Sequence, residues 1–178
     1  TAKLGGLKVT TTLDMCKQKL AEEAMAKGMA QVKRQGGDTA AFVAEDVKTG
    51  QVVALVGGSD FNNAEYGQNN YARQKLPPGS SFKPYDYLSV IEHTDQFGAG
   101  AVLYDSPDQI PGYPCTNKAK KGGNCLDDYD FRYPGPLTLR YALGGSRNVP
   151  AVKSMLIAGV DKTIETANNL GLKDTGNE

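Results

Sequence analysis

The sequence predicts an α/β (α+β) domain in which helices cover both faces of a sheet. Two nearly continuous apolar runs, AAFVAED and QVVALVGG, are joined by VKTG, which is typical of a β-hairpin with Gly50 at a turn position that tolerates positive φ. Strands that are apolar along their whole length are buried on both faces, so helices are expected against this sheet. The last third of the chain supplies helical segments that end at glycines: PLTLRYAL, PAVKSMLIA and DKTIETANNL.

Residues 1–36 are expected to form a strand and a helix that lead into the domain. GGLKVTTTLD contains a β-rich run from Leu7 to Thr12 and ends at Asp14, a residue that favours a helix start. Apolar residues then recur at helical spacing up to about Val32, where QGGD interrupts the pattern. This pattern includes Leu13, Cys16, Leu20 and Ala24. Cys16 is therefore predicted to be buried as a small apolar residue.

Two polar stretches, residues 57–76 and 95–136, are predicted to be long irregular loops, which are usually functional or disordered. Cys115 and Cys125 bracket TNKAKKGGN in the second stretch. A disulfide between them would imply an oxidising compartment, and the alternative is two free thiols. His93 is the only histidine and is expected at the surface near a helix end, so the sequence predicts no metal site.

The charge balance of the 178 residues excludes one class of partner. Lysine plus arginine and aspartate plus glutamate both number 20, so no net basic field attracts nucleic acid. No apolar run approaches the length of a membrane span, and no secretory signal opens the chain. Because the first residue is Thr1 rather than methionine, these absences leave open a longer parent protein.

The segment PPGSSFKPYDYL places a serine at a helix start. Pro84 lacks an amide hydrogen and is tolerated only in the first turn, so the helix is predicted to begin at about Ser80 or Ser81. Unpaired amides and the helix dipole there favour an oxyanion, as forms when a serine attacks a carbonyl. Lys83 shares a face with Ser80 and is a candidate base, whereas Ser81 has Pro84 at that offset. Gly79 leaves room for a substrate backbone.

A serine and a lysine three residues apart occur by chance in a chain of this composition, so the pair needs support. GGSRNVPAV supplies it, because Ser146 and Asn148 lie on a turn between two predicted helices and can point into one cleft. There Ser146 would relay a proton and Asn148 would hold a substrate amide. Taken alone, Ser146 is an ordinary helix cap. For Lys83 to act as a base it must spend time neutral, in a site that is largely dry or holds another positive charge.

In these segments the sequence resembles the transpeptidase domain of class A bifunctional penicillin-binding proteins. GGLKVTTTLD resembles the lead-in to that domain, VKTGQVVALVGG its first hairpin, PPGSSFKP the active-site serine motif, and GPLTLRYALGGSRNVPAVK the S-x-N motif with its flanking helices. The resemblance covers essentially the whole chain. It implies the penicillin-binding protein and serine β-lactamase-like fold, a mixed sheet with helices on both faces, with the N-terminal part of the domain at residues 37–178.

The resemblance also implies a reaction and its residues. Ser80 would attack the penultimate D-alanine carbonyl of a peptidoglycan stem pentapeptide and pass the acyl group to an amine of a neighbouring stem. Lys83 would be the base, Ser146 the proton relay, Asn148 a contact to the stem peptide, and Gly79 part of the substrate site, with no cofactor. Partners would be the stem peptides of lipid II-derived glycan strands and β-lactams. The site would face outside the cytoplasmic membrane, with an anchor and a glycosyltransferase domain upstream.

One motif departs from the family pattern. A functional K-T-G triplet lies on a strand after the S-x-N motif in the family, whereas Lys48, Thr49 and Gly50 precede the serine and form the tip of the predicted hairpin. We therefore expect the chain to stop partway through the domain. Alone it is expected to be inactive or badly impaired, unless a second chain carries the remainder of the domain as a partner.

Two other functions share these motifs. A serine β-lactamase has the same fold but needs an additional deacylating group, and the match to GGLKVTTTLD argues against it. A β-lactam-sensing or binding relative would use acylation as its signal. Arg73, shortly before the serine motif, is either structural or a contact to a stem carboxylate.

Overall fold

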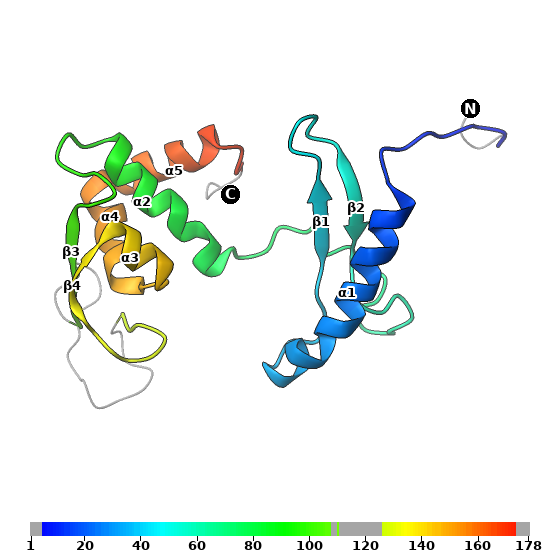
Figure 1. Ribbon diagram of the computed structural model, residues 1–178, viewed down its shortest axis with the longest axis horizontal. Helices are drawn as coiled ribbons and strands as arrows, with labels where there is room; N and C mark the ends of the chain where they lie inside the picture. The colour runs from blue at the N-terminus through cyan, green and yellow to red at the C-terminus, as the bar shows by residue number, and fades with distance from the viewer. Residues whose placement is uncertain (1–4, 108–109, 111–125, 174–178) are drawn as a thin grey trace. The chain divides into compact units, whose positions relative to one another are not determined.

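The structure is a computed structural model that describes residues 5–107, 110 and 126–173 (Figure 1). It divides into two compact units, Thr1–Leu76 and Pro77–Glu178, each of which is described by itself. Cys115 and Cys125 lie outside the described residues, so the disulfide between them stays a prediction.

The first unit is a helix packed on a β-hairpin. Helix α1 (Met15–Arg34) begins after Asp14, whose carboxylate accepts hydrogen bonds from the backbone of Cys16 and Lys17. Strands β1 (Phe42–Glu45) and β2 (Val52–Val56) pair antiparallel, as the sequence predicts. α1 packs on β2, which fixes the helix on one face of the hairpin.

Two predictions for the first unit are wrong. Leu7–Thr12 forms no strand in the part of the chain that the structure describes, although the Thr12 hydroxyl donates to Val52 O at 2.5 Å. Cys16 is exposed and Leu20 is 65% exposed. The helix instead turns its smaller residues toward the hairpin, with Ala21 only 7% exposed. Alanine allows close approach of a helix to a sheet, so here local packing overrides the larger apolar side chains.

The hairpin is only partly buried within its own unit. Ala54 is 1% exposed, whereas Phe42 and Val43 are 44% and 42% exposed. The architecture is α+β, and the described strands form two separate antiparallel pairs, β1–β2 and β3–β4. Within the described ranges each unit holds two strands that pair with each other, which fits an incomplete α+β domain.

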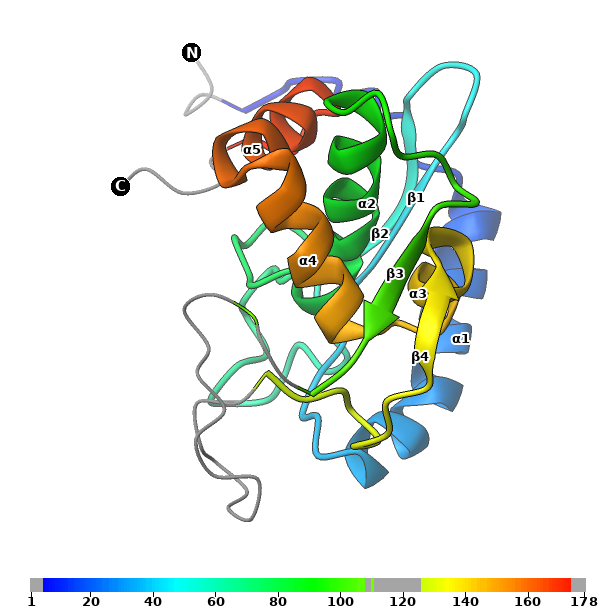
Figure 2. The same ribbon diagram turned by 90° about the vertical axis from the view of Figure 1, so that its left-hand side faces the viewer.

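The second unit is mainly helical (Figure 2). Its elements are the 3-10 turn η2 (Gly79–Phe82), α2 (Lys83–Glu92), β3 (Val102–Asp105), β4 (Gly135–Thr138), α3 (Leu139–Gly144), α4 (Asn148–Ala158) and α5 (Val160–Asn169). α2 packs against α4 and α5, and β3 lies beside α4. The predicted helix at the serine motif thus starts as a 3-10 turn and becomes α-helical at Lys83.

Strand β3 corrects the prediction that residues 95–136 are irregular throughout. Its four residues alternate between exposed and buried, with Leu103 and Asp105 facing inward. β4 pairs with it in the register Leu103 with Leu137 and Asp105 with Gly135. A buried aspartate in a short strand masks the apolar alternation by which strands are predicted.

The core of the second unit lies between α2, α4 and the β3–β4 pair. It consists of Tyr87, Val90, Leu103, Leu139, Ala142 and Ala151. Burying one such large apolar side chain contributes about 1.5–3 kcal/mol. Ser89 and Thr163, both buried, join α2 to α5 through a hydroxyl pair at 2.9 Å. Together these contacts hold α2 against α4 and α5.

Candidate active site

The serine of the PPGSSFKP segment lies in η2, and the lysine opens α2. Gly79 begins η2 at φ +54°, a left-handed value that glycine adopts without steric cost. A Cβ on Gly79 would meet no atom of the described chain within 4 Å beyond its neighbours, so the backbone here faces open space. Ser80 is exposed and Lys83 is 7% exposed. The Lys83 amine reaches Ser80 Oγ at 3.1 Å.

Lys83 also contacts the S-x-N turn, 63 residues further along the chain. Its Nζ lies 2.5 Å from Ser146 O, 3.0 Å from Ser146 Oγ and 2.6 Å from Asn148 Oδ1. The structure therefore brings Ser80, Lys83, Ser146 and Asn148 together around one amine.

The S-x-N turn holds Ser146 in an uncommon backbone conformation. Ser146 has φ +50°, the left-handed region that costs a residue with a Cβ about 1–2 kcal/mol. Its amide donates to Leu143 O, and the Arg147 amide donates to Ala142 O, both at 2.9 Å. Arg147, not Ser146, occupies the N-cap position of α4. Ser146 Oγ lies instead at Lys83, so the reading of Ser146 as an ordinary helix cap is wrong.

Arg147 anchors this turn in the interior. It is 6% exposed, and its Nε donates to Asp105 Oδ2 at 2.7 Å. Nη1 donates to Asp130 Oδ1 at 3.0 Å, and Nη2 donates to Arg132 O. Asp128 Oδ2 lies 3.3 Å from Nη2. One side chain thus ties the turn to the end of β3 and to the segment before β4.

Asn148 is held from three sides. Its backbone amide donates to Asp128 Oδ1 at 2.5 Å, and its side-chain amide donates to Asp127 O at 2.7 Å. The carbonyl end of the side chain accepts from Lys83. Because the nitrogen has a carbonyl partner and the oxygen has an amine partner, the orientation of the carboxamide is fixed.

The surroundings of Lys83 shift its pKa in opposing directions. Burial lowers the pKa of the amine below its ordinary value, the charges of Asp128 and Asp86 oppose this, and Arg147 adds to it. Burial raises the pKa of Asp86 to about 7, against the effect of Lys83. The net lowering at Lys83 favours the neutral amine that a base requires.

The acidic side chains that support the turn are not predicted from the sequence. Asp105, Asp127 and Asp128 belong to AVLYD and LDDYD, which were predicted to lie in an irregular stretch. The available signal was the arginine inside S-R-N, since a buried arginine requires carboxylate partners. Arg73 is exposed in the first unit, and nothing in the structure distinguishes its two predicted roles.

The Lys48-Thr49-Gly50 triplet lies in the hairpin turn of the first unit, as predicted. Asp46 Oδ1 accepts from the backbone of Lys48 and Thr49 at 3.0 Å each, and Gly50 has φ +68°. No group of three metal-ligating side chains occurs among the described residues. None of the helices within the described ranges combines the length and apolar character needed to cross a membrane.

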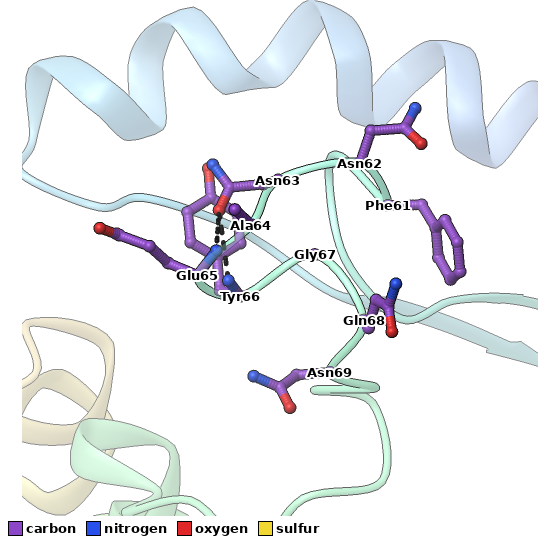
Figure 3. A pocket seen from close by; sticks show the side chains of 9 residues that line it. All are labelled: Phe61, Asn62, Asn63, Ala64, Glu65, Tyr66, Gly67, Gln68 and Asn69. Atoms are coloured by element: carbon purple, nitrogen blue, oxygen red, sulfur yellow. Dashed lines mark hydrogen bonds between the residues drawn. The ribbon is translucent and has the colours of Figure 1, made fainter.

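A polar hollow of about 270 Å³ lies in the first unit, lined by residues 61–69 (Figure 3). Asn63 Oδ1 accepts from the amides of Glu65 and Tyr66 at 2.9 and 3.2 Å, which curls the loop. Gly67 is required in it, because a Cβ there would lie 2.4 Å from Asp60 O. Phe61 and Glu65 point to opposite sides of the loop in Figure 3.

An α+β fold with S-x-x-K and S-x-N side chains around one amine is the arrangement expected of serine acyltransferases that react with penicillin. The sequence profile of the family described as "Penicillin binding protein transpeptidase domain" matches residues 40–178. The chain belongs to this family.

Individual relatives agree with this assignment. The chain is 38% identical over 176 residues to "Penicillin-binding protein 1A/1B" of Bacillus subtilis, covering 94% of the chain and 17% of that relative. The crystal structure of penicillin-binding protein 1A from Haemophilus influenzae is 32% identical, with a TM-score of 0.59, over 75% of the chain and 18% of that structure. Penicillin-binding protein PonA1 from Mycobacterium tuberculosis, at 24% identity, shares the fold with a TM-score of 0.70 over 98% of the chain and 41% of that structure. The chain spans about a fifth of the length of the curated relatives it matches.

Proposed function

We propose that this chain carries the acylation residues of a peptidoglycan D,D-transpeptidase, with Ser80 as the nucleophile. Lys83 takes the proton of Ser80, Ser146 relays a proton to the leaving group, and Asn148 holds Lys83 and borders the stem peptide. Gly79 leaves space for the substrate backbone. The substrate is the D-Ala-D-Ala end of a stem peptide outside the cytoplasmic membrane, and β-lactams acylate the same serine.

The contacts of Lys83 Nζ carry this proposal. Ser146 O and Asn148 Oδ1 only accept hydrogen bonds, and they are its closest partners at 2.5 and 2.6 Å. A neutral amine has two N–H groups and one lone pair, so these two acceptors would take both N–H groups. The lone pair is then available to the hydroxyls of Ser80 and Ser146, at 3.1 and 3.0 Å. This geometry supports a lysine that accepts a proton from one serine and returns it through the other.

The acylation step follows from this proton path. The Ser80 oxygen bonds to the carbonyl carbon of the penultimate D-alanine while its proton passes to Lys83. The tetrahedral intermediate collapses, the C–N bond breaks, and the departing D-alanine receives the Lys83 proton through the Ser146 hydroxyl. An amine of a neighbouring stem then attacks the ester carbon, loses a proton to the same path and releases Ser80.

Residues 1–36 are proposed as the lead-in and residues 37–178 as the N-terminal part of the transpeptidase domain. A family match that starts at residue 40 is in line with this boundary.

Intact-mass spectrometry of the chain with penicillin tests the nucleophile. Because the chain alone is expected to be inactive or badly impaired, a mass gain of one drug molecule should require a long incubation or the remainder of the domain on a second chain. Ser80→Ala should abolish the gain, whereas Ser81→Ala should keep it, since Ser81 Oγ donates to Pro78 O at 2.6 Å and not to Lys83. Equal labelling of the wild type and Ser80→Ala would refute the assignment.

The lifetime of the adduct separates the related functions. A persistent adduct together with release of D-alanine from a stem-peptide analogue supports a transpeptidase. A persistent adduct without D-alanine release would indicate a β-lactam sensor, and rapid hydrolysis would indicate a serine β-lactamase.

A further inference from the structure

The middle residue of the S-x-N motif connects the turn to two distant parts of the second unit. Arg147 is 6% exposed, and its Nε lies 2.7 Å from Asp105 Oδ2 at the end of β3. It also contacts four members of residues 127–132, the support segment: Asp128, Tyr129, Asp130 and Arg132. A guanidinium presents several donors in one fixed plane, so it can hold these partners at once, which a lysine ammonium cannot.

Helix α4 begins without a cap from its own N-cap residue. Arg147 occupies that position but forms no side-chain hydrogen bond with the helix end. The Asn148 amide at the start of α4 donates instead to Asp128 Oδ1 at 2.5 Å. A carboxylate is favoured there by the unpaired amides and the helix dipole. The support segment therefore supplies the cap that a serine, threonine, asparagine or aspartate usually provides.

The same segment also orients the side chain of Asn148. Its Nδ2 donates to Asp127 O at 2.7 Å, which leaves Oδ1 to accept from Lys83 Nζ at 2.6 Å. Ser146 needs comparable support, because its φ of +50° is a strained value that persists only where surrounding contacts impose it. Arg147, the next residue, supplies a buried anchor for that conformation. Both side chains that meet the lysine amine from the turn therefore depend on contacts outside the turn.

We propose that Arg147 and Asp128 are positioning residues for acylation, which hold the S-x-N turn within reach of the Lys83 amine. Neither touches a reacting atom in the proposed mechanism. Arg147 acts through the backbone of the turn, and Asp128 acts through the first amide of α4. The effect on acylation rests on the proposed function, whereas the placement of the turn does not, so the two can be tested separately.

The charge of Asp128 gives a second account of its role, with the opposite prediction. Burial lowers the pKa of Lys83, and the negative charge of Asp128 opposes this lowering. If Asp128 acted only through its charge, its removal would lower the pKa of Lys83 further and speed proton transfer from Ser80 near pH 7. If Asp128 positions the turn, its removal slows that transfer instead. The sign of the rate change therefore separates the two accounts.

Amide hydrogen exchange of the whole chain, followed by NMR, tests the placement of the turn without any reaction. The Asn148 amide should exchange about 10- to 100-fold faster in Asp128→Ala, the factor expected for loss of a hydrogen bond to a charged group. Asp128→Asn should lose less protection, because its carboxamide oxygen can accept the same amide. The amide of Val90, which is 0% exposed on α2, should keep its protection in both variants. Equal exchange of the Asn148 amide in the wild type and Asp128→Ala would overturn the role of Asp128.

Arg147→Lys tests the arginine by a milder change, which also serves if Asp128→Ala fails to fold. It keeps the charge but loses the guanidinium fork, so it should shift the amide signals of Ser146 and Asn148. Arg140→Lys, an exposed change on α3, is the matched control and should leave both signals in place. Unchanged Ser146 and Asn148 signals in Arg147→Lys would show that the arginine does not hold the turn.

Penicillin labelling of Ser80 tests the consequence for acylation, under the conditions in which the wild type labels. We expect Asp128→Ala and Arg147→Lys each to slow labelling roughly 10- to 100-fold, because small misplacements of catalytic groups cost that much. Asp128→Asn should retain more of the rate than Asp128→Ala. Asp95→Ala, which removes an exposed carboxylate of the same unit, is the control and should label at the wild-type rate.

The outcomes separate the positioning role from the proposed function. Faster labelling of Asp128→Ala and Asp128→Asn near pH 7 would show that Asp128 acts through its charge and would overturn its positioning role. Labelling of Asp128→Ala and Arg147→Lys at the wild-type rate would overturn both positioning roles. If exchange and amide signals change as expected but Ser80 labels under no condition, the proposed function fails and the placement of the turn by Arg147 and Asp128 stands.

Discussion

Asn148→Asp tests whether Lys83 must be neutral for the reaction. The substitution is nearly isosteric. It places a negative oxygen where Asn148 Oδ1 now lies, 2.6 Å from Lys83 Nζ, and it replaces the amide that donates to Asp127 O at 2.7 Å with a second oxygen. At an effective dielectric constant of about 20, two unit charges at this 2.6 Å separation attract by about 6 kcal/mol. Allowing half of this for relaxation and solvent leaves about 3 kcal/mol, which raises the pKa of Lys83 by about two units.

The expected result is a shift in the pH dependence of Ser80 labelling and not an equal loss of labelling rate at every pH. The neutral fraction of Lys83 near pH 7 falls about 100-fold, and labelling of Ser80 by penicillin should fall by the same factor. Raising the pH should restore much of the rate, and the ¹⁵N signal of the Lys83 amine should titrate about two units higher. Asn148→Ala is the comparison variant, because it removes the acceptor without adding charge. A rate loss in Asn148→Asp that no increase in pH restores, with an unshifted Lys83 signal, would refute the role of Lys83 as base.

Three further predictions concern the scaffold. Leu139→Ala should lower the free energy of unfolding by about 2–5 kcal/mol, because Leu139 is 2% exposed in the core, whereas Leu143→Ala on the same helix, at 38% exposure, should cost far less in a denaturant titration. Gly67→Ala should open the 61–69 loop to hydrogen exchange, because its Cβ would lie 2.4 Å from Asp60 O, whereas Gly98→Ala, with no described atom within 4 Å, should not. Asp86→Asn should stabilise the chain more at pH 8 than at pH 5. Folding raises the pKa of Asp86 from 3.8 to about 7, so the wild type loses the stability of the protonated carboxyl as the pH rises through 7, whereas an asparagine stays neutral. Equal stabilisation at both pH values would contradict the last prediction.

Local sequence rules predicted the helices that carry the site better than they predicted the long-range contacts that hold its side chains together. Pro84 fixed the helix start to within a turn. Glycine and proline positions predicted the three C-terminal helices, although the first three residues of PLTLRYAL belong to β4 and the helix there begins at Leu139. These signals are local, since they depend on a missing amide hydrogen or an accessible φ. The contacts of Lys83 with Ser146 and Asn148 join residues more than sixty positions apart, and only the family resemblance indicated them before the structure.

The failures have a common physical origin. Hydrophobicity alone predicts a buried helix face that contains Leu13, Cys16 and Leu20. In the structure α1 packs through Ala21 instead, whose small side chain lets the helix approach β2. The sequence predicts Asp105 in a loop, whereas the structure buries it at the end of β3. Burial of an aspartate depends on a cation brought from elsewhere in the chain, here Arg147, and no local pattern reports that partner.

The backbone of Ser146 shows what Arg147 must hold in place. A serine at φ +50° costs about 1–2 kcal/mol relative to an ordinary conformation, and glycine at the same position avoids this cost but loses about 0.5–1 kcal/mol of chain entropy. Ser146→Gly should therefore be more stable than Ser146→Ala by roughly 0.5–1 kcal/mol in denaturant titrations, while both lack the hydroxyl and label Ser80 slowly. A glycine variant that is less stable than the alanine variant would mean that the turn stores no strain. The expected ordering would mean that the turn holds a strained serine, whose hydroxyl lies 3.0 Å from Lys83.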